Sequence, residues 1–435
     1  MNAVPGLWDA ADRMAGLAES AAAPLKLPIQ ARRRRSSGPE LADPRAKLHL
    51  VDDDGLRRWV YEPPAAEQTR RRASRASFAG ALTGNVLRSF SFTERAPAAR
   101  GPNQVTQALA ALDARLTPNQ GLRRWNGTQW VADPAPALTG KTLLLVHGTF
   151  SNSDMYTAQW GETPGGQHLW QQLQARYRTN ILAFDHPTLS VAPWINALDL
   201  AAALRNVTGT VDVVSHSRGG LVTSWWLRLA PVRARQVIFV GSPLDGTSLA
   251  SPHRLRAALD HLATIADLLA AGGQALATVA PIAAGAAGLA KIFGRTLKLG
   301  ANLPIADAAV ALVPGLASQQ RTSNNAETER LFAQKWLSAP TFAAVTAQFQ
   351  PQASEPLFRV WDRLKLLGAQ AVAGAADVLF DGPNDLVVDT AAMDFLGTHH
   401  AVQPADRLAL GPGNTFHTSY FRDDRVTAFL DARLR

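Results

Sequence analysis

The sequence has no cysteine among its 435 residues, and this absence excludes several kinds of site. A chain without thiols forms no disulfide, no thiolate zinc site and no iron–sulfur cluster, and it has no cysteine nucleophile. It also lacks a His-Glu-x-x-His motif, an EF-hand loop and a Walker-type glycine loop. Zinc-protease, calcium-sensor and nucleotide chemistry therefore have no motif, and we expect neither a metal nor a cofactor.

Charged residues are sparse at 18%, whereas hydrophobic residues make up 46% of the chain. This balance is that of an ordinary globular protein and argues against a mostly disordered one. At roughly 150 residues per domain, the length suggests two or three units or one large decorated unit.

The basic excess is concentrated near the start of the chain. Residues 1–100 hold 17 Lys and Arg against 11 Asp and Glu, with arginine clusters at 32–35 and 70–75. Such clusters can contact anionic lipid or nucleic acid. Because no aromatic residues are interleaved and no nucleic-acid-binding motif occurs, we predict a solvated basic segment and no nucleic-acid partner, while contact with a lipid surface stays open. Charges within residues 1–30 interrupt any signal-peptide core, so we expect a cytoplasmic protein.

Residues 1–45 are rich in Ala, Pro, Ser and Arg without periodicity and are expected to form a weakly ordered arm. Residues 46–140 are expected to form a β-rich extension. The string Gly-Leu-Arg-Arg-Trp occurs there twice, at 55–59 and 121–125, next to Asp-Gly and Asn-Gly steps. Such steps between Val, Trp and Tyr residues predict two hairpins, as a structural layer or a binding module.

From residue 141 the pattern changes to short apolar runs separated by helical stretches, which predicts a parallel sheet with crossover helices. This α/β core is expected at 141–250 and again at 352–435. The predicted strands are residues 142–146, 181–184, 211–214, 237–240, 369–373 and 408–410, and the predicted helices are 194–204, 221–229 and 425–434.

Residues 251–351 interrupt the core with Ala-rich and Leu-rich helical patterns and are expected to form a cap or lid. Within them, residues 268–290 carry no charge and are long enough to cross a bilayer. The run is rich in alanine and has four glycines and one proline, so its transfer into lipid is weak. We therefore expect core or lid helices and no transmembrane segment.

The most informative segment is residues 211–220, Val-Asp-Val-Val-Ser-His-Ser-Arg-Gly-Gly. It places Ser217 in a sharp turn between a β-branched strand and a helix, the arrangement called a nucleophile elbow. The turn tolerates only small residues two positions either side, here Ser215 and Gly219. Glycine is usual at the first position, so Ser215 is a departure. The backbone N–H of Arg218 is predicted to help stabilise an oxyanion.

A second segment, Leu-Leu-Leu-Val-His-Gly-Thr-Phe at 143–150, resembles the oxyanion loop of α/β-hydrolase lipases and esterases. The resemblance implies an α/β-hydrolase fold in which Thr149 donates the second oxyanion N–H and His147 ties the loop down. A third match, Gly-Ser-Pro-Leu-Asp-Gly-Thr at 241–247, looks like a turn of bacterial lipase-like proteins. The resemblance covers residues 141–435.

In this family the acid and the base follow the serine in the chain. Asn384-Asp-Leu-Val-Val388 resembles the acid-bearing segment of lipases, which implies Asp385 as the acid, although Leu386 replaces a glycine. The base is expected to be His417, which lies in a polar loop just before the last helix. Asp381 and Asp389 are the alternative acids, and His399 and His400 are the alternative bases. His216 is expected to be structural.

Some lipases that this sequence resembles bind a structural calcium near the acid. Asp381, Asp385 and Asp389 form a local acidic cluster, but we predict no metal there. The predicted activity is hydrolysis of carboxylic esters with hydrophobic acyl groups, or of polyesters, by a Ser-His-Asp triad. An amidase or thioesterase of the same fold is an alternative. Another is a lipid-binding or partner-binding effector that uses the hydrolase domain as a scaffold.

Overall fold

The computed structural model contains an α/β core, which begins at residue 104, and a small three-stranded sheet formed within residues 46–92. The described residues are 46–53, 56–62, 85–92, 104–229, 234–250, 284–285, 287–289, 292, 313–333, 336, 340–350, 380, 382–397 and 402–435. The predicted arm at 1–45, the predicted strand at 369–373 and most of the predicted cap lie outside them.

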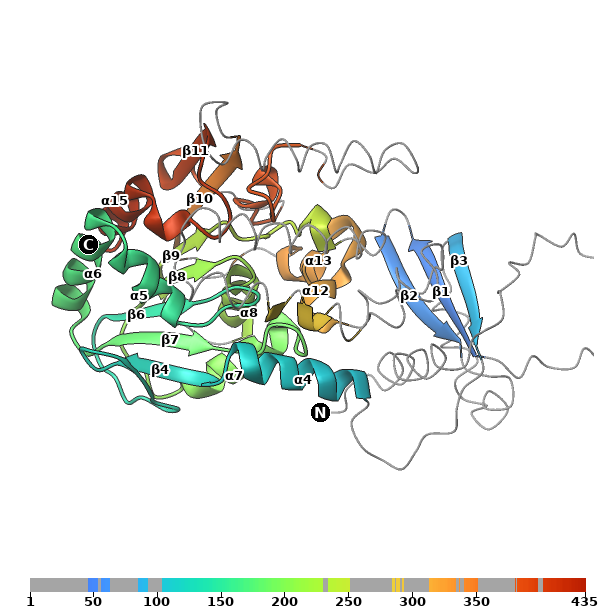
Figure 1. The fold of residues 1–435 in the computed structure, drawn as a ribbon, viewed down its shortest axis with the longest axis horizontal. Coiled ribbons are helices and arrows are strands. Elements are labelled where there is room, and N and C mark those ends of the chain that lie inside the picture. The colour runs from blue at the N-terminus through green and yellow to red at the C-terminus, as the bar shows by residue number, and fades with distance from the viewer. Residues whose placement is uncertain are drawn as a thin grey trace, which may run out of the picture.

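An eight-stranded sheet organises the core (Figure 1). Its order is β11-β10-β9-β8-β6-β7-β4-β5. The six strands from β6 to β11 are parallel, while β4 pairs antiparallel with β7 and with β5. The strands are β4 Gly121–Trp125, β5 Trp130–Ala132, β6 Thr142–Val146, β7 Ile181–Asp185, β8 Val211–His216, β9 Ala234–Val240, β10 Thr341–Phe349 and β11 Arg407–Gly413. The predicted α/β-hydrolase fold is confirmed, as are the strands predicted around β6, β7, β8, β9 and β11.

Helices cover both faces of this sheet, and alternate residues of β6 show how the two cores divide. Leu143 and Leu145 pack with α5, α6 and α15, while Leu144 and Val146 pack with α7, α8 and α13. A strand buried on both faces is apolar throughout, which is why β6 reads as an unbroken run. The helices are α4 Gln104–Leu116, α5 Asp154–Gly161, α6 Pro164–Tyr177, α7 Pro193–Ala203, α8 Gly219–Leu229, α12 Pro314–Ala317, α13 Ala326–Phe332 and α15 Asp424–Arg433. The three predicted core helices are confirmed as α7, α8 and α15.

Strand β10 corrects the prediction for residues 251–351, which were expected to be helical throughout. It lies inside the sheet, parallel to β9 on one side and β11 on the other. Its sequence, Thr-Phe-Ala-Ala-Val-Thr-Ala-Gln-Phe, contains three alanines, which favour helix by local propensity. Pairing along both edges and burial of most of its side chains determine the strand instead.

Both predicted hairpins are confirmed. In a three-stranded sheet of order β2-β1-β3, strands β1 Ala46–Asp53 and β2 Leu56–Glu62 pair antiparallel, with Asp53 opposite Leu56, and β3 Asn85–Phe92 pairs with β1. The second hairpin is β4-β5, and it extends the main sheet. The region expected as a β-rich extension thus contributes two strands to the core and also contains helix α4. Among the helices that the structure describes, none has the length and apolarity needed to span a membrane.

Candidate active site

Ser217 lies at the end of the central strand β8, in a strained backbone conformation. Its φ is 54°, in the left-handed region, which costs a non-glycine residue about 1–3 kcal/mol. Its N–H donates to the carbonyl of Val240 at 3.0 Å, and its carbonyl accepts from the N–H of Gly220 at 2.9 Å. These two hydrogen bonds hold the turn between the neighbouring strand β9 and the first turn of α8, as the predicted elbow requires.

Two glycines allow this turn to pack against the end of β6. A Cβ atom on Gly219 would overlap the carbonyl of Val146, so only glycine fits after the elbow. A Cβ atom on Gly148 would lie 2.6 Å from the Cβ of Ser217. The loop after β6 therefore lies directly against Ser217. Ser215, which stands where glycine is usual, is fully buried with its Oγ 3.4 Å from the carbonyl of Ile238.

The structure brings Ser217, His417 and Asp385 together, although 200 residues separate the first two. His417 Nε2 lies 2.8 Å from Ser217 Oγ, and its Nδ1 lies 2.8 Å from Asp385 Oδ2. All three side chains are buried. Because the carboxylate can only accept a hydrogen bond, Nδ1 carries the proton, and Nε2 is left as an acceptor for the serine hydroxyl.

Asp385 is fixed by four donors. Its Oδ1 accepts from the backbone N–H groups of Val387 and Val388 at 3.0 and 2.7 Å, and its Oδ2 accepts from His417 and from the hydroxyl of Tyr420 at 2.8 Å. The loop turns sharply at the next residue, Leu386, whose φ is 79°. This is the position where the lipase segment has glycine, so leucine here adopts a backbone conformation that costs about 1–2 kcal/mol.

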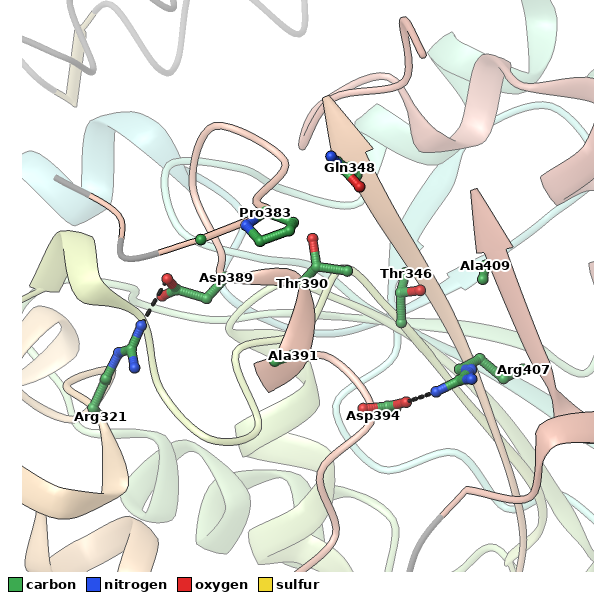
Figure 2. A pocket seen from close by; sticks show the side chains of 11 residues that line it. Arg321, Thr346, Gln348, Pro383, Asp389, Thr390, Ala391, Asp394, Arg407 and Ala409 are labelled. Atoms are coloured by element: carbon green, nitrogen blue, oxygen red, sulfur yellow. Dashed lines mark hydrogen bonds and ion pairs between the residues drawn. The ribbon is translucent and has the colours of Figure 1, made fainter. Parts of the chain in front are cut away.

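Ser217, His417 and Asp385 form a hydrogen-bonded row. Of the alternative acids and bases, the structure describes Asp389, which is not part of this row. Asp389 instead accepts from the backbone N–H of Ser248 and from Arg321, both at 2.8 Å, and Figure 2 shows its pairing with Arg321. Asp381, His399 and His400 lie outside the described residues. Within the part of the chain that the structure describes, no three His, Asp or Glu side chains are grouped so as to hold a metal ion.

A pocket lies beside the loop that carries Asp385, between that loop and strands β10 and β11 (Figure 2). Two ion pairs stand in its wall, Arg321 with Asp389 and Arg407 with Asp394. Each arginine is paired with a carboxylate, so the four groups together present no net charge to a ligand.

Tyr420 is a site residue that the sequence analysis did not identify. Its hydroxyl shares the Oδ2 atom of Asp385 with His417, and burial and the nearby carboxylate raise its pKa well above the ordinary value. It therefore remains a protonated donor. The available signal was its position, three residues after His417 in the same short loop.

His147, expected to be structural, contacts its own loop and the end of β7. Its Nδ1 lies 2.8 Å from the carbonyl of Gly148, and its Nε2 is 3.1 Å from the N–H of His186. Since a carbonyl can only accept, Nδ1 carries the proton and Nε2 accepts. Burial lowers the pKa of His147 to about 4, so the ring is neutral at pH 7.

His216 supports the backbone of His417. Its Nε2 is 2.8 Å from the carbonyl of His417, to which it donates. Burial, together with the nearby His417 ring, lowers the pKa of His216 to about 3. The imidazole next to the serine is thus neutral and contacts the base through the main chain.

The N–H groups of Thr149 and Arg218 make no hydrogen bond to other residues that the structure describes. The two residues flank Ser217 from the β6 loop and from the elbow. Next to Thr149, Phe150 has a φ of 55° and donates its N–H to Thr188 Oγ1. The Arg218 side chain is buried below the elbow with Nη2 on the carbonyl of Val191, and burial lowers its pKa to about 10, which leaves it charged at pH 7.

The third matched motif, residues 241–247, links the loops around the serine. The N–H of Thr247 donates to the carbonyl of Gln319 at 2.8 Å, and its Oγ1 donates to the carbonyl of Val387 at 2.5 Å. Gln319 in turn contacts Thr149, and Val387 lies in the Asp385 loop. One short turn therefore connects the two sides of the site.

Residues 114–435 match the model of a family described as a domain of unknown function, DUF7379. The chain belongs to this family. The matched range contains the whole eight-stranded sheet and all three residues of the hydrogen-bonded row. No curated protein matches the chain.

Solved structures similar to this chain include lipases and an epoxide hydrolase. The mature lipase BlEst2 of Bacillus licheniformis is 18% identical over 70% of this chain and 95% of its own, with a TM-score of 0.37. Lipase 1 of Pelosinus fermentans is 13% identical over 68% and 98%, with a TM-score of 0.41. The Cif epoxide hydrolase of Acinetobacter nosocomialis is 13% identical over 78% and 100%, with a TM-score of 0.38. At these values the comparison assigns no activity to this chain.

Proposed function

We propose that this protein is a serine hydrolase that cleaves carboxylic esters through an acyl-enzyme. The observation that carries the proposal is the buried row from Ser217 Oγ through the His417 ring to Asp385 Oδ2, with 2.8 Å at each step. The strained φ of Ser217 supports it further, because such strain persists in proteins mainly where function requires it.

In the proposed mechanism Ser217, His417 and Asp385 transfer the acyl group of the ester to water. Ser217 Oγ attacks the ester carbonyl while its proton passes to His417 Nε2, and the carbonyl oxygen becomes an oxyanion. Asp385 stabilises the imidazolium through Nδ1–H. The N–H groups of Thr149 and Arg218 are assigned to the oxyanion. The oxyanion then collapses and breaks the ester C–O bond while the imidazolium protonates the leaving alcohol, so that the acyl group stays on Ser217. Water, deprotonated by His417 Nε2, attacks this acyl-enzyme; the second collapse breaks the bond to Ser217 Oγ, which takes the proton from His417 as the acid leaves.

Hydrophobic acyl esters are the proposed substrate class, an inference from the apolar composition of residues 251–351. A panel of p-nitrophenyl esters from short to long acyl chains, with one p-nitroanilide and one thioester, tests both the activity and this preference. Fastest hydrolysis of the short-chain esters would contradict the proposed preference for hydrophobic acyl groups. Faster cleavage of the anilide or of the thioester would mean that the protein is an amidase or a thioesterase.

The decisive variant is Ser217→Ala. We expect it to abolish hydrolysis and labelling by a fluorophosphonate probe, with an unchanged far-ultraviolet circular dichroism spectrum. Peptide mass spectrometry of the wild type should find the probe on Ser217. Equal hydrolysis by both proteins, or a label on another residue, would reject the proposal.

A further inference from the structure

The side-chain amide of Gln319 joins the loop that follows β6 to the segment around α12. Its Nε2 lies 2.7 Å from the carbonyl of Gly315 and 3.1 Å from Thr149 Oγ1. Gln319 is buried, and its backbone is held on both sides: its N–H donates to Leu316, and its carbonyl accepts from Thr247. The amide therefore has one fixed position.

These contacts determine the direction of the Thr149 hydroxyl proton. A carbonyl accepts and cannot donate, so the atom next to the carbonyl of Gly315 must be the amide nitrogen. Its two protons then go to Gly315 and to Thr149 Oγ1. Among the residues that the structure describes, the other hydrogen-bond contact of Oγ1 is with Gln319 Oε1 at 3.5 Å, beyond the usual 2.5–3.0 Å for a hydroxyl donor. Thr149 thus accepts from Gln319 and keeps its own proton for another partner.

Thr149 also follows directly on the glycine that packs against the reacting serine. The preceding residue, Gly148, is so close that an added Cβ would lie 3.1 Å from Ser217 Oγ. Thr149 is the next residue of this loop and the one whose backbone N–H is assigned to the oxyanion, so its hydroxyl belongs to a residue that borders the oxyanion position.

We propose that the Thr149 hydroxyl is a third donor to the oxyanion and that Gln319 is the residue that positions it. This inference rests on the proposed esterase function. The hydroxyl donates a hydrogen bond and transfers no proton, since the Ser217 proton goes to His417. A hydrogen bond to an ionised acceptor is stronger than one to a neutral carbonyl, so the contribution is larger in the transition state than in the bound substrate.

Thr149→Val removes the hydroxyl with little change of shape, and Thr149→Ser keeps it. With p-nitrophenyl butyrate, we expect Thr149→Val to lower kcat about 100-fold with KM nearly unchanged, as for loss of one oxyanion donor. Thr149→Ser, which keeps the hydroxyl, should recover most of the kcat that Thr149→Val loses. Rates are expressed per Ser217 labelled at saturating fluorophosphonate, so that misfolded protein does not count.

Gln319→Glu tests the positioning role. A carboxylate cannot donate to Thr149 and instead accepts a hydrogen bond from its hydroxyl, so kcat should fall as in Thr149→Val. In the Thr149→Val background the same change should cost little more, because the hydroxyl is already gone. Inhibition by a phenylboronic acid, whose tetrahedral adduct on Ser217 carries a similar negative charge, should weaken by the same factor as kcat in each variant.

The two proposals fail in different ways. Wild-type kcat and boronate inhibition in Thr149→Val, with the wild type active, would overturn the third donor and leave the esterase intact. Additive losses in the double variant would overturn the role of Gln319. A wild type that neither hydrolyses esters nor takes the label would instead reject the esterase itself.

Discussion

The hydroxyl of Tyr420 and the imidazole of His417 meet on one carboxylate oxygen, each 2.8 Å from Asp385 Oδ2. The other oxygen takes two backbone amides. The carboxylate is thus held in one orientation by main chain on one side and by side chains on the other, and the tyrosine restrains the side that faces the base.

Tyr420→Phe should therefore destabilise the protein and slow the reaction. Loss of a hydrogen bond to a charged acceptor costs about 1.5–3 kcal/mol of unfolding free energy. Looser restraint of Asp385 should lower kcat/KM about tenfold, or about 1.4 kcal/mol. Urea unfolding and ester kinetics measure the two effects.

Tyr156→Phe is the matched control for Tyr420. Tyr156 is equally buried, and its hydroxyl donates to the neutral carbonyl of Val146 at 2.8 Å. It should cost less stability, about 1 kcal/mol, and leave kcat/KM near wild type. If the two variants lose equal activity, Tyr420 acts only through the packing of the fold.

Ser217 predicts an inversion of the usual stability order of alanine and glycine. At a position with ordinary φ, a glycine variant is less stable than an alanine variant by about 0.5–1 kcal/mol, because glycine gives the unfolded chain more conformational entropy. At a φ of 54°, alanine keeps the strain and glycine removes it. Ser217→Gly should thus be at least as stable as Ser217→Ala in thermal and urea unfolding, both being inactive. Alanine clearly above glycine would mean that the elbow is unstrained.

The two aspartates that compete for the role of acid make different contacts. In Asp385→Asn an amide faces Nδ1 of His417, and the ring no longer holds the tautomer in which Nε2 accepts from Ser217. By analogy with other triads, kcat should fall about 10⁴-fold. Asp389→Asn leaves the row intact and weakens the contacts with Ser248 and Arg321. It should reduce stability and keep most of the activity. A greater kinetic loss in Asp389→Asn would move the acid to that residue.

Much of the fold could be predicted from the sequence because strands buried on both faces consist mainly of consecutive apolar residues, as in β6 and β7. The elbow was predictable because only small residues fit beside it, which Gly219 illustrates. Strand β10 was missed because its alanines favour helix locally, and its pairing with β9 and β11 is a long-range effect.

Contacts between distant loops could not be predicted in the same way. The approach of Tyr420 and of Gln319 depends on how the segments after β9, β10 and β11 pack, and no local pattern encodes it. The departure at Leu386 was visible in the sequence, and the φ of 79° shows that the turn keeps its shape without the usual glycine. Hydrogen bonds from the backbone N–H groups of this loop to Asp385 and Asn384 offset the free-energy cost of the positive φ.

His216 predicts part of the loss of stability in acid. Burial and the nearby His417 lower its folded pKa to about 3, whereas the unfolded value is about 6.5. Between these values the unfolded chain binds a proton that the folded protein excludes, so stability falls as pH drops from about 6.5 toward 3. His216→Gln retains an N–H donor for the carbonyl of His417 but does not titrate. In urea unfolding from pH 7 to pH 4 it should lose roughly 3 kcal/mol less than the wild type, at about 1.4 kcal/mol per pH unit. Parallel stability curves for the two proteins would show that the ring takes up its proton in the folded state.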